Sequence, residues 1–257
     1  MGVLIFDTHA HYDDEQFDED RDALLASMPE NGVGRILDPG CDRESSQKAV
    51  ALAERFPHVF AAVGWHPENC APYDSPELDE LRRLARHPKV VAIGEIGLDY
   101  YWAENPPRDF QQRVFREQLS LAEELGLPVI VHDRDAHADS LAIVREFPGV
   151  RGVFHCFSGS VEMARELWKL GWYVGFDGPL TYKNAKKTVE VAAAAPADRI
   201  LLETDSPYLA PVPLRGTRND SRSLVHVARR LAEIRGTTAE EIIAQTAENG
   251  ARLFGMT

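Results

Sequence analysis

The sequence has few cysteines, and their spacing does not pair them. Cys41, Cys70 and Cys156 are odd in number and form no Cys-x-x-Cys motif, which favours reduced thiols over a disulfide framework or a zinc knot. No apolar run approaches the roughly 20 residues of a membrane span, and the first residues lack the basic end of a secretory signal. We therefore expect a cytoplasmic protein that does not cross a membrane.

Positive charge is also scarce. Lys and Arg number 28 against 41 Asp and Glu, for a formal net charge of −13. A protein that coats long nucleic acid needs a basic stripe, so this balance excludes that mode of binding. It leaves a local phosphate site open, because carboxylates that hold divalent cations count as negative although the loaded site can be positive.

Low-complexity tracts are absent too. No Gly-rich, Ser-rich or Pro-rich segment divides the 257 residues, of which 44% are apolar and 27% charged. The length alone fits one α/β barrel or two small domains. The even composition favours one domain over residues 1–257.

Short apolar runs alternate with segments of helical composition. Eight runs read as buried strands: residues 3–6, 35–37, 59–63, 90–93, 128–131, 152–154, 172–176 and 200–202. Helices are expected between them, at residues 21–31, 43–55, 77–86, 109–124, 138–146, 161–170 and 185–195, with two more at 224–234 and 239–254. This alternation predicts a (β/α)8 TIM barrel, whose usual size is roughly 250 residues.

Reactive side chains follow many of these strands. In such a barrel all strands open on one face, where active sites are built. The residues expected to meet there, despite their distance in sequence, are His9, His11, His66, Glu95, His132, His155 and Asp205.

The composition of this set points to metal. His9 and His11 are two residues apart, so on an extended segment they project to the same side and can hold one ion. Packing alone would favour Val or Ile at a strand end, and an unpaired buried carboxylate has a large desolvation penalty that a divalent cation removes. We therefore expect a metal-dependent site and not a purely structural cluster.

Two divalent cations fit the number of ligands. Our hypothesis is that Glu95 bridges the ions, and that the remaining ligands divide into His9, His11 and Asp205 on one ion and His132 and His155 on the other. Mixed imidazole and carboxylate ligands suit Zn²⁺, Mn²⁺ or Co²⁺, and Mg²⁺ if water fills several positions.

The motifs around these residues resemble those of the TatD-type metal-dependent deoxyribonucleases. The resemblance is colinear over nearly the whole chain, through Asp7-Thr8-His9-Ala10-His11, Gly94-Glu95-Ile96-Gly97-Leu98-Asp99, His132-Asp133-Arg134, His155-Cys156-Phe157-Ser158-Gly159, Glu203-Thr204-Asp205-Ser206-Pro207 and Pro211-Val212-Pro213-Leu214-Arg215-Gly216. It implies an amidohydrolase-like TIM barrel that hydrolyses phosphodiester bonds of DNA with divalent metal. Two positions depart from the family pattern: Asp220-Ser221 replaces the usual Glu-Pro, and Asp177 replaces a small residue.

Roles for individual residues follow from this chemistry. Water held between two cations has a lowered pKa and can attack phosphorus, with Asp205 as proton acceptor and Glu95 as the bridging ligand. His66 has no obvious metal role, so we assign it to the phosphate or the leaving oxygen. The arginines expected to hold phosphate oxygens are Arg134, Arg215 and Arg218.

Three functions remain open at this stage. The leading one is an exonuclease acting on single-stranded DNA ends, as a monomer or weak oligomer; digestion from the 3′ end is implied by the family resemblance alone. The second keeps the metal site but cleaves an amide or ester, such as an aminoacyl ester on transfer RNA. The carbamylated lysine of many such hydrolases would stand where this chain has Glu95, which argues against it. The third is a non-catalytic metal-binding or nucleic-acid-binding protein.

Overall fold

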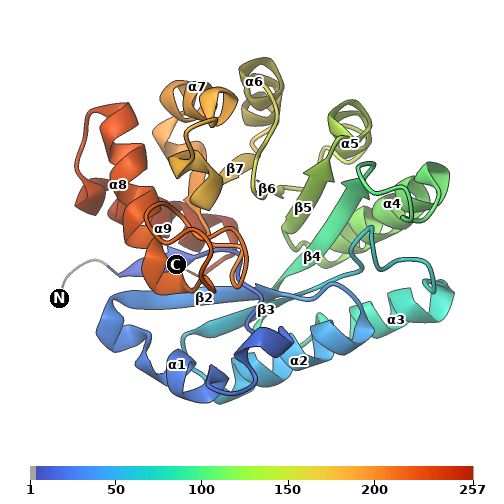
Figure 1. Ribbon diagram of the computed structural model, residues 1–257. Helices are drawn as coiled ribbons and strands as arrows, with labels where there is room; N and C mark the ends of the chain where they lie inside the picture. Colours follow the sequence, from blue (N-terminus) through green and yellow to red (C-terminus); the bar gives the residue numbers. More distant parts are fainter. Residues whose placement is uncertain (1–3, 257) are drawn as a thin grey trace.

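The computed structural model describes residues 4–256 and contains one eight-stranded parallel sheet (Figure 1). The strands pair in chain order: β1 (Ile5–Asp7), β2 (Val33–Pro39), β3 (Val59–Val63), β4 (Val90–Asp99), β5 (Val129–Arg134), β6 (Gly152–Phe154), β7 (Tyr173–Phe176) and β8 (Ile200–Leu202). The segment that follows β1 contacts β8 and the residues after it, which brings the two ends of the sheet together: the Thr8 amide donates to the Leu202 carbonyl at 3.1 Å, and Ala10 forms a parallel bridge with Ser206. The predicted (β/α)8 barrel is confirmed.

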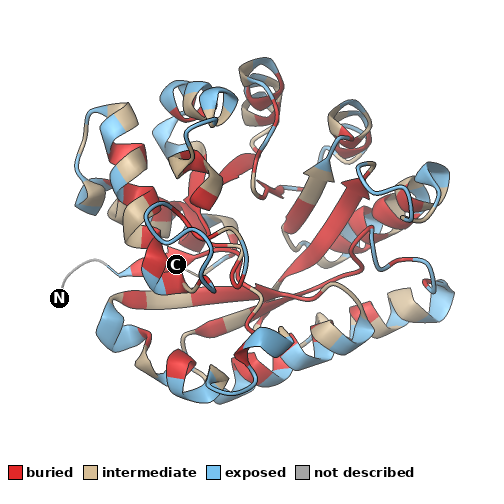
Figure 2. Ribbon diagram, viewed as in Figure 1, coloured by how far each residue is buried: buried red, intermediate tan, exposed pale blue. Residues whose placement is uncertain are grey.

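Helices surround the sheet on its outer side. They are α1 (Arg21–Ser27), α2 (Arg43–Arg55), α3 (Ser75–Leu84), α4 (Arg108–Leu125), α5 (His137–Val144), α6 (Val161–Lys169), α7 (Lys186–Ala194), α8 (Leu224–Arg235) and α9 (Ala239–Leu253). Figure 2 shows the strands buried and the outer helix faces exposed. Among residues 4–256, no helix is both long and apolar enough to cross a membrane.

Two apolar clusters lie on opposite sides of the strands. Along β2, Ile36 packs in the cluster between strands and helices, whereas Leu37 belongs to the cluster inside the barrel, as the period-two alternation of a strand requires. Phe254, directly after α9, joins the interior cluster and lies 6.0 Å from the ring of Phe6. The last helix therefore helps to fill the barrel interior.

Some predicted boundaries differ from the structure. The helix expected over residues 21–31 ends at Ser27, and a 3₁₀ turn from Pro29 to Asn31 follows, because proline lacks the N–H that would continue an α-helix. The first strand was expected from Val3, which lies outside the described residues. All other predicted helices and strands are present, with ends shifted by a few residues.

The largest shift concerns β4, which was expected to end at Ile93 but continues to Asp99. Its pairing with β5 changes register between Ile93 and Ile96, an irregularity of the kind that re-aims side chains near active sites. Glu95 lies inside this irregular stretch. His132 likewise lies within β5 and not beyond it.

Candidate metal centre

Four side chains meet where β1, β4 and β8 approach one another. Nε2 of His9 lies 3.0 Å from Nε2 of His11, 3.3 Å from Oε2 of Glu95 and 3.5 Å from Oδ1 of Asp205. His11 Nε2 lies 3.5 Å from the same Glu95 oxygen and 3.6 Å from the same Asp205 oxygen. We call these four residues the first group.

The first group has the dimensions of a metal site. Donor atoms placed tetrahedrally at about 2.0 to 2.1 Å from a zinc-sized ion are separated by roughly 3.3 Å. The measured separations, from 3.0 to 3.6 Å, surround that value. Two imidazoles and two carboxylates also form a donor set that divalent transition metals accept.

A second group gathers around the other oxygen of Glu95. Oε1 of Glu95 lies 2.6 Å from Nε2 of His155 and 3.0 Å from Nδ1 of His132, and these two ring nitrogens are 3.2 Å apart. His66 approaches the same oxygen, with its Nε2 at 3.5 Å. The two oxygens of one carboxylate thus face two separate sets of donors.

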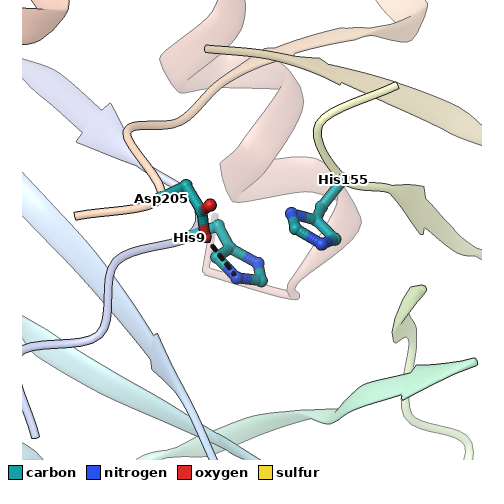
Figure 3. Close-up of side chains that lie close together, drawn as sticks. All are labelled: His9, His155 and Asp205. Atoms are coloured by element: carbon teal, nitrogen blue, oxygen red, sulfur yellow. Dashed lines mark ion pairs between the residues drawn. The ribbon is translucent and has the colours of Figure 1, made fainter. Parts of the chain in front are cut away.

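His155 connects the two groups. Its ring stacks on that of His9 with centroids 4.0 Å apart and planes 7° from parallel (Figure 3). Asp205 lies beside both rings, and one ligand atom from each of the three lies within 4.8 Å of the others. The six residues expected to ligate metal therefore converge.

Hydrogen bonds on the far side of the rings set their orientation. Nε2 of His132 lies 3.1 Å from Oδ2 of Asp99, and Nδ1 of His11 lies 3.2 Å from the Pro39 carbonyl. With Nε2 of His132 donating to Asp99 and Nδ1 of His11 donating to Pro39, the second nitrogen of each ring faces the centre and would be the ligand atom when a cation is bound. These imidazoles are oriented as metal ligands.

Asp7 supports the loops that carry the first group. It is fully buried and accepts hydrogen bonds from the Thr204 hydroxyl and the Ser221 hydroxyl, both at 2.7 Å, and from the backbone amide of His9 at 3.3 Å. Burial raises the pKa of Asp7 to about 6. Ser221, one of the two family departures, thus binds the carboxylate that joins the loops after β1 and β8.

The electrostatics of the centre favour an ionised Glu95. Burial opposes its charge, but the imidazoles of His155, His66 and His9 hold the pKa of Glu95 well below its usual range. Burial likewise opposes a charged His155, yet Glu95 and other nearby carboxylates raise its pKa to about 10. An ionised carboxylate surrounded by imidazoles is a suitable environment for a bound cation.

The backbone is strained beside two of the converging residues. Asp205 has φ of +56°, and Cys156, directly after His155, has φ of +42°. Non-glycine residues take such values rarely, and mainly where surrounding contacts enforce them. The Asp205 amide donates to the His9 carbonyl at 2.9 Å, which holds the Asp205 carboxylate beside the two histidines of the first group.

Two cavities open on the centre. One, of about 610 Å³, is lined by His11, His66, Glu95 and several further acids, Asp13, Asp14, Asp42 and Glu68. We call it the acidic cavity. The other, of about 390 Å³, includes Ser158, Pro179 and Leu209 in its lining. Both are also lined by His132, Arg134, His155, Asp205 and Tyr208.

The three predicted phosphate-binding arginines occupy different environments. Arg134 lines both cavities, and its guanidinium lies 4.0 Å above the ring centroid of Tyr101. Arg215 stacks on Tyr182 at 4.2 Å, and neither lines the cavities described above. Arg218 donates to both carboxylate oxygens of Asp20, at 2.8 and 2.6 Å. The structure brings only Arg134 to the centre.

The other family departure, Asp177, lies behind the centre. It is buried, and its Oδ2 atom has no hydrogen-bond partner within residues 4–256. Burial, with Asp205 nearby, raises the pKa of Asp177 to about 7. Glu203 is also buried there, accepts a hydrogen bond from the Cys156 amide and has its pKa raised to about 8, chiefly by burial.

Several residues at the site were not predicted. Asp13 and Glu68 each stand two positions after a predicted residue, His11 and His66, in the turn that follows it, so the acids next to each predicted histidine were a usable signal. Asp38 follows directly after the apolar residues of β2. A carboxylate at the end of an apolar run was a second usable signal. Tyr208 offered none, because its hydroxyl donates to Asp14, 194 positions away, at 2.7 Å.

Imidazole and carboxylate donors at the carboxyl end of a parallel eight-stranded barrel define a metal-dependent hydrolase. A family model described as TatD related DNase matches residues 6–255. The chain therefore belongs to the TatD family, and the resemblance predicted from its motifs is confirmed.

Individual relatives match over nearly their full length. The chain is 44% identical to the "Uncharacterized metal-dependent hydrolase YabD" of Bacillus subtilis (strain 168), over 98% of this chain and 99% of that protein. It is 39% identical to the "3'-5' ssDNA/RNA exonuclease TatD" of Cronobacter sakazakii, over 97% of both. The crystal structure of YJJV, a TatD homologue from Escherichia coli K12, superposes with a TM-score of 0.93 at 35% identity, covering 99% of both chains.

Proposed function

We propose that this hydrolase cleaves phosphodiester bonds of single-stranded DNA from a free end, using two divalent cations. The observation that carries the proposal is the position of Glu95, whose Oε2 faces His9 and His11 while its Oε1 faces His132 and His155. One carboxylate between two donor groups is the arrangement expected of a two-metal hydrolase. Relatives named as exonucleases on single-stranded DNA and RNA support the substrate class.

Six residues of this chain would hold the cations. His9, His11 and Asp205 would bind one ion and His132 and His155 the other, with Glu95 between them. When bound, divalent cations lower the pKa of water and neutralise charge on phosphoryl oxygens. The ions Zn²⁺, Mn²⁺ and Co²⁺ fit the donors, and Mg²⁺ would require more water.

Other side chains would act on the substrate directly. Asp205 lines both cavities, and burial raises its pKa, which suits it to accept the proton of the attacking water. Arg134 would hold a non-bridging phosphate oxygen. His66 is buried with its pKa lowered to about 4, by burial and by the nearby His132, so its neutral ring would contact the phosphate or the leaving oxygen.

The surroundings of the centre favour an unpaired strand end. The acidic cavity and the net charge of −13 repel a long duplex. Tyr101, Trp102 and Tyr208 are large exposed aromatic residues, and the last two line the acidic cavity. Unpaired bases stack on such rings without regard to sequence.

The test incubates the metal-loaded protein with four substrates: end-labelled single-stranded DNA, duplex DNA, RNA and an aminoacyl ester. The Asp205→Asn variant is assayed in parallel. We expect single-stranded DNA to be shortened stepwise, and the variant to lose at least about 100-fold in kcat, the usual scale for losing a proton acceptor. Cleavage of only the ester would favour the amide or ester hydrolase. Binding of DNA without turnover would favour the non-catalytic reading, and DNA cleavage that survives the variant or chelation would indicate a contaminant.

A further inference from the structure

A separate group of carboxylates lies beside His11. Asp13 is in the loop after β1, and Asp38 is the penultimate residue of β2. One oxygen from each and one ring nitrogen of His11 lie within 4.8 Å of one another. Neither aspartate belongs to the two groups of the metal centre.

The strand determines where Asp38 points. Leu37 faces the barrel interior and Ile36 packs on the helix side of the sheet. By alternation Asp38 shares the side of Ile36, where the loop that carries Asp13 passes. The two carboxylates therefore meet between the sheet and the loop after β1, outside the barrel interior.

These two carboxylates face each other, and within residues 4–256 no third side chain donates a hydrogen bond to Asp38 or to Oδ1 of Asp13. Asp38 is fully buried, and within residues 4–256 neither of its oxygens has a hydrogen-bond partner; the same holds for Oδ1 of Asp13. Arg21 is close enough to influence Asp38, but it donates to the carbonyls of Tyr12, Asp13 and Asp14 and to the carboxylate of Asp18. Buried oxygens facing each other in this way require a positive charge or a proton between them.

The surroundings favour a cation over a shared proton. Asp13 lines the acidic cavity together with Asp14, Asp42 and Glu68. The negative charge of these four residues concentrates cations in the cavity, next to Asp13. His11 supplies no ligand here, because its Nδ1 donates to the Pro39 carbonyl and lies 4.0 Å from Asp13. A site of carboxylate oxygens completed by water suits a hard cation such as Mg²⁺, Mn²⁺ or Ca²⁺.

We propose that Asp13 and Asp38 bind a third divalent cation, distinct from the two at Glu95. It ties the loop from His11 to Asp14 onto the end of β2 and places positive charge at the wall of the acidic cavity. The proposal does not depend on which bond the enzyme cleaves.

The experiment counts Mn²⁺ ions bound per chain, by titrating the full-length protein and following free Mn²⁺ by electron paramagnetic resonance. Asp38→Asn removes the buried charge while nearly conserving shape. We expect it to bind one equivalent fewer than the unaltered protein. Asp42→Asn is the matched control: it removes a carboxylate from the same cavity, and asparagine still caps α2, so its count should equal that of the unaltered protein.

Equal counts and affinities for the unaltered protein and Asp38→Asn would overturn the proposal and leave a shared proton between the aspartates. Asp13→Asn provides a second variant, also expected to lose one equivalent, should Asp38→Asn fail to fold by circular dichroism. Mn²⁺ should also raise the Tm of the unaltered protein more than that of either variant. These readouts need no DNA cleavage, so they stand apart from the test of nuclease activity.

Discussion

Nε2 of His132 and Oδ2 of Asp99 lie 3.1 Å apart, and this contact determines which nitrogen of the ring faces Glu95. Asp99 is itself held in place, because its carboxylate accepts hydrogen bonds from the Tyr101 amide at 2.9 Å and the Asn105 side chain at 3.0 Å. With Nε2 donating to Asp99, Nδ1 of His132 is the ring nitrogen that faces Glu95, at 3.0 Å, and it is the atom that would bind a cation.

Replacing Asp99 with Asn should therefore weaken metal binding without removing a ligand. We expect the affinity for the ion held by His132 to fall by about 10-fold to 100-fold, the usual effect of losing a carboxylate behind a metal-bound histidine. Equilibrium dialysis with metal analysis measures this. Asp139→Asn is the control, since Asp139 accepts hydrogen bonds from Tyr100 and Gln112 and, within residues 4–256, forms no hydrogen bond or ion pair with a histidine. Equal affinities for the two variants would show that Asp99 does not position the ring.

Arg134 and Arg218 should behave differently when replaced by alanine. Arg134 lines both cavities, and a hydrogen bond to a charged group contributes roughly 1.5 to 3 kcal/mol. Arg134→Ala should therefore raise KM for DNA by about tenfold or more. Arg218 is paired with Asp20, so Arg218→Ala should leave KM unchanged and lower the free energy of unfolding by about 1 kcal/mol or less.

Steady-state kinetics on one labelled single-stranded oligonucleotide, with urea unfolding of both variants, measures both effects. A larger rise in KM for Arg218→Ala than for Arg134→Ala would contradict this assignment of the two arginines.

The sequence was sufficient to predict the barrel fold and to predict that the polar residues at the ends of its strands lie close together. Parallel strands open on one face, so His9, His132 and Asp205 could be brought together without coordinates. The same reasoning stopped at Ile93, where the apolar run gives way to Gly94 and Glu95, whereas β4 continues to Asp99.

The remaining features depend on contacts between distant segments. The position of Arg218 depends on Asp20, 198 positions earlier, and motif spacing carries no information about such a pair. The neighbourhood of Asp13 and Asp38 likewise requires the loop after β1 to fold over β2. Short local patterns cannot report these packing contacts.

Asp177 should make stability depend on pH in the metal-free protein. Its pKa is raised from 3.8 to about 7, chiefly by burial, so the folded state holds this proton more tightly than the unfolded state does. The contribution of Asp177 to the free energy of unfolding is therefore greatest at low pH and is lost as pH rises from about 4 to about 7. The loss is on the order of 4 kcal/mol.

Urea unfolding in the presence of chelator, at pH 5 and pH 8, checks this dependence. Asp177→Asn cannot ionise, so its stability should fall less between these pH values than that of the unaltered protein. Asp198→Asn, at an exposed carboxylate paired with Arg199, should follow the unaltered protein. Parallel pH profiles for Asp177→Asn and the unaltered protein would show that Asp177 is not the titrating group.

The most direct test of the two-metal centre is an anomalous-scattering map from crystals grown with Mn²⁺. We expect one peak within ligand distance of His9, His11, Glu95 and Asp205, and a second within ligand distance of Glu95, His132 and His155. Crystals of Glu95→Gln should show both peaks weakened, because one carboxylate serves both ions. A single peak in this region, or two peaks that both lie beyond ligand distance of Glu95, would contradict the account.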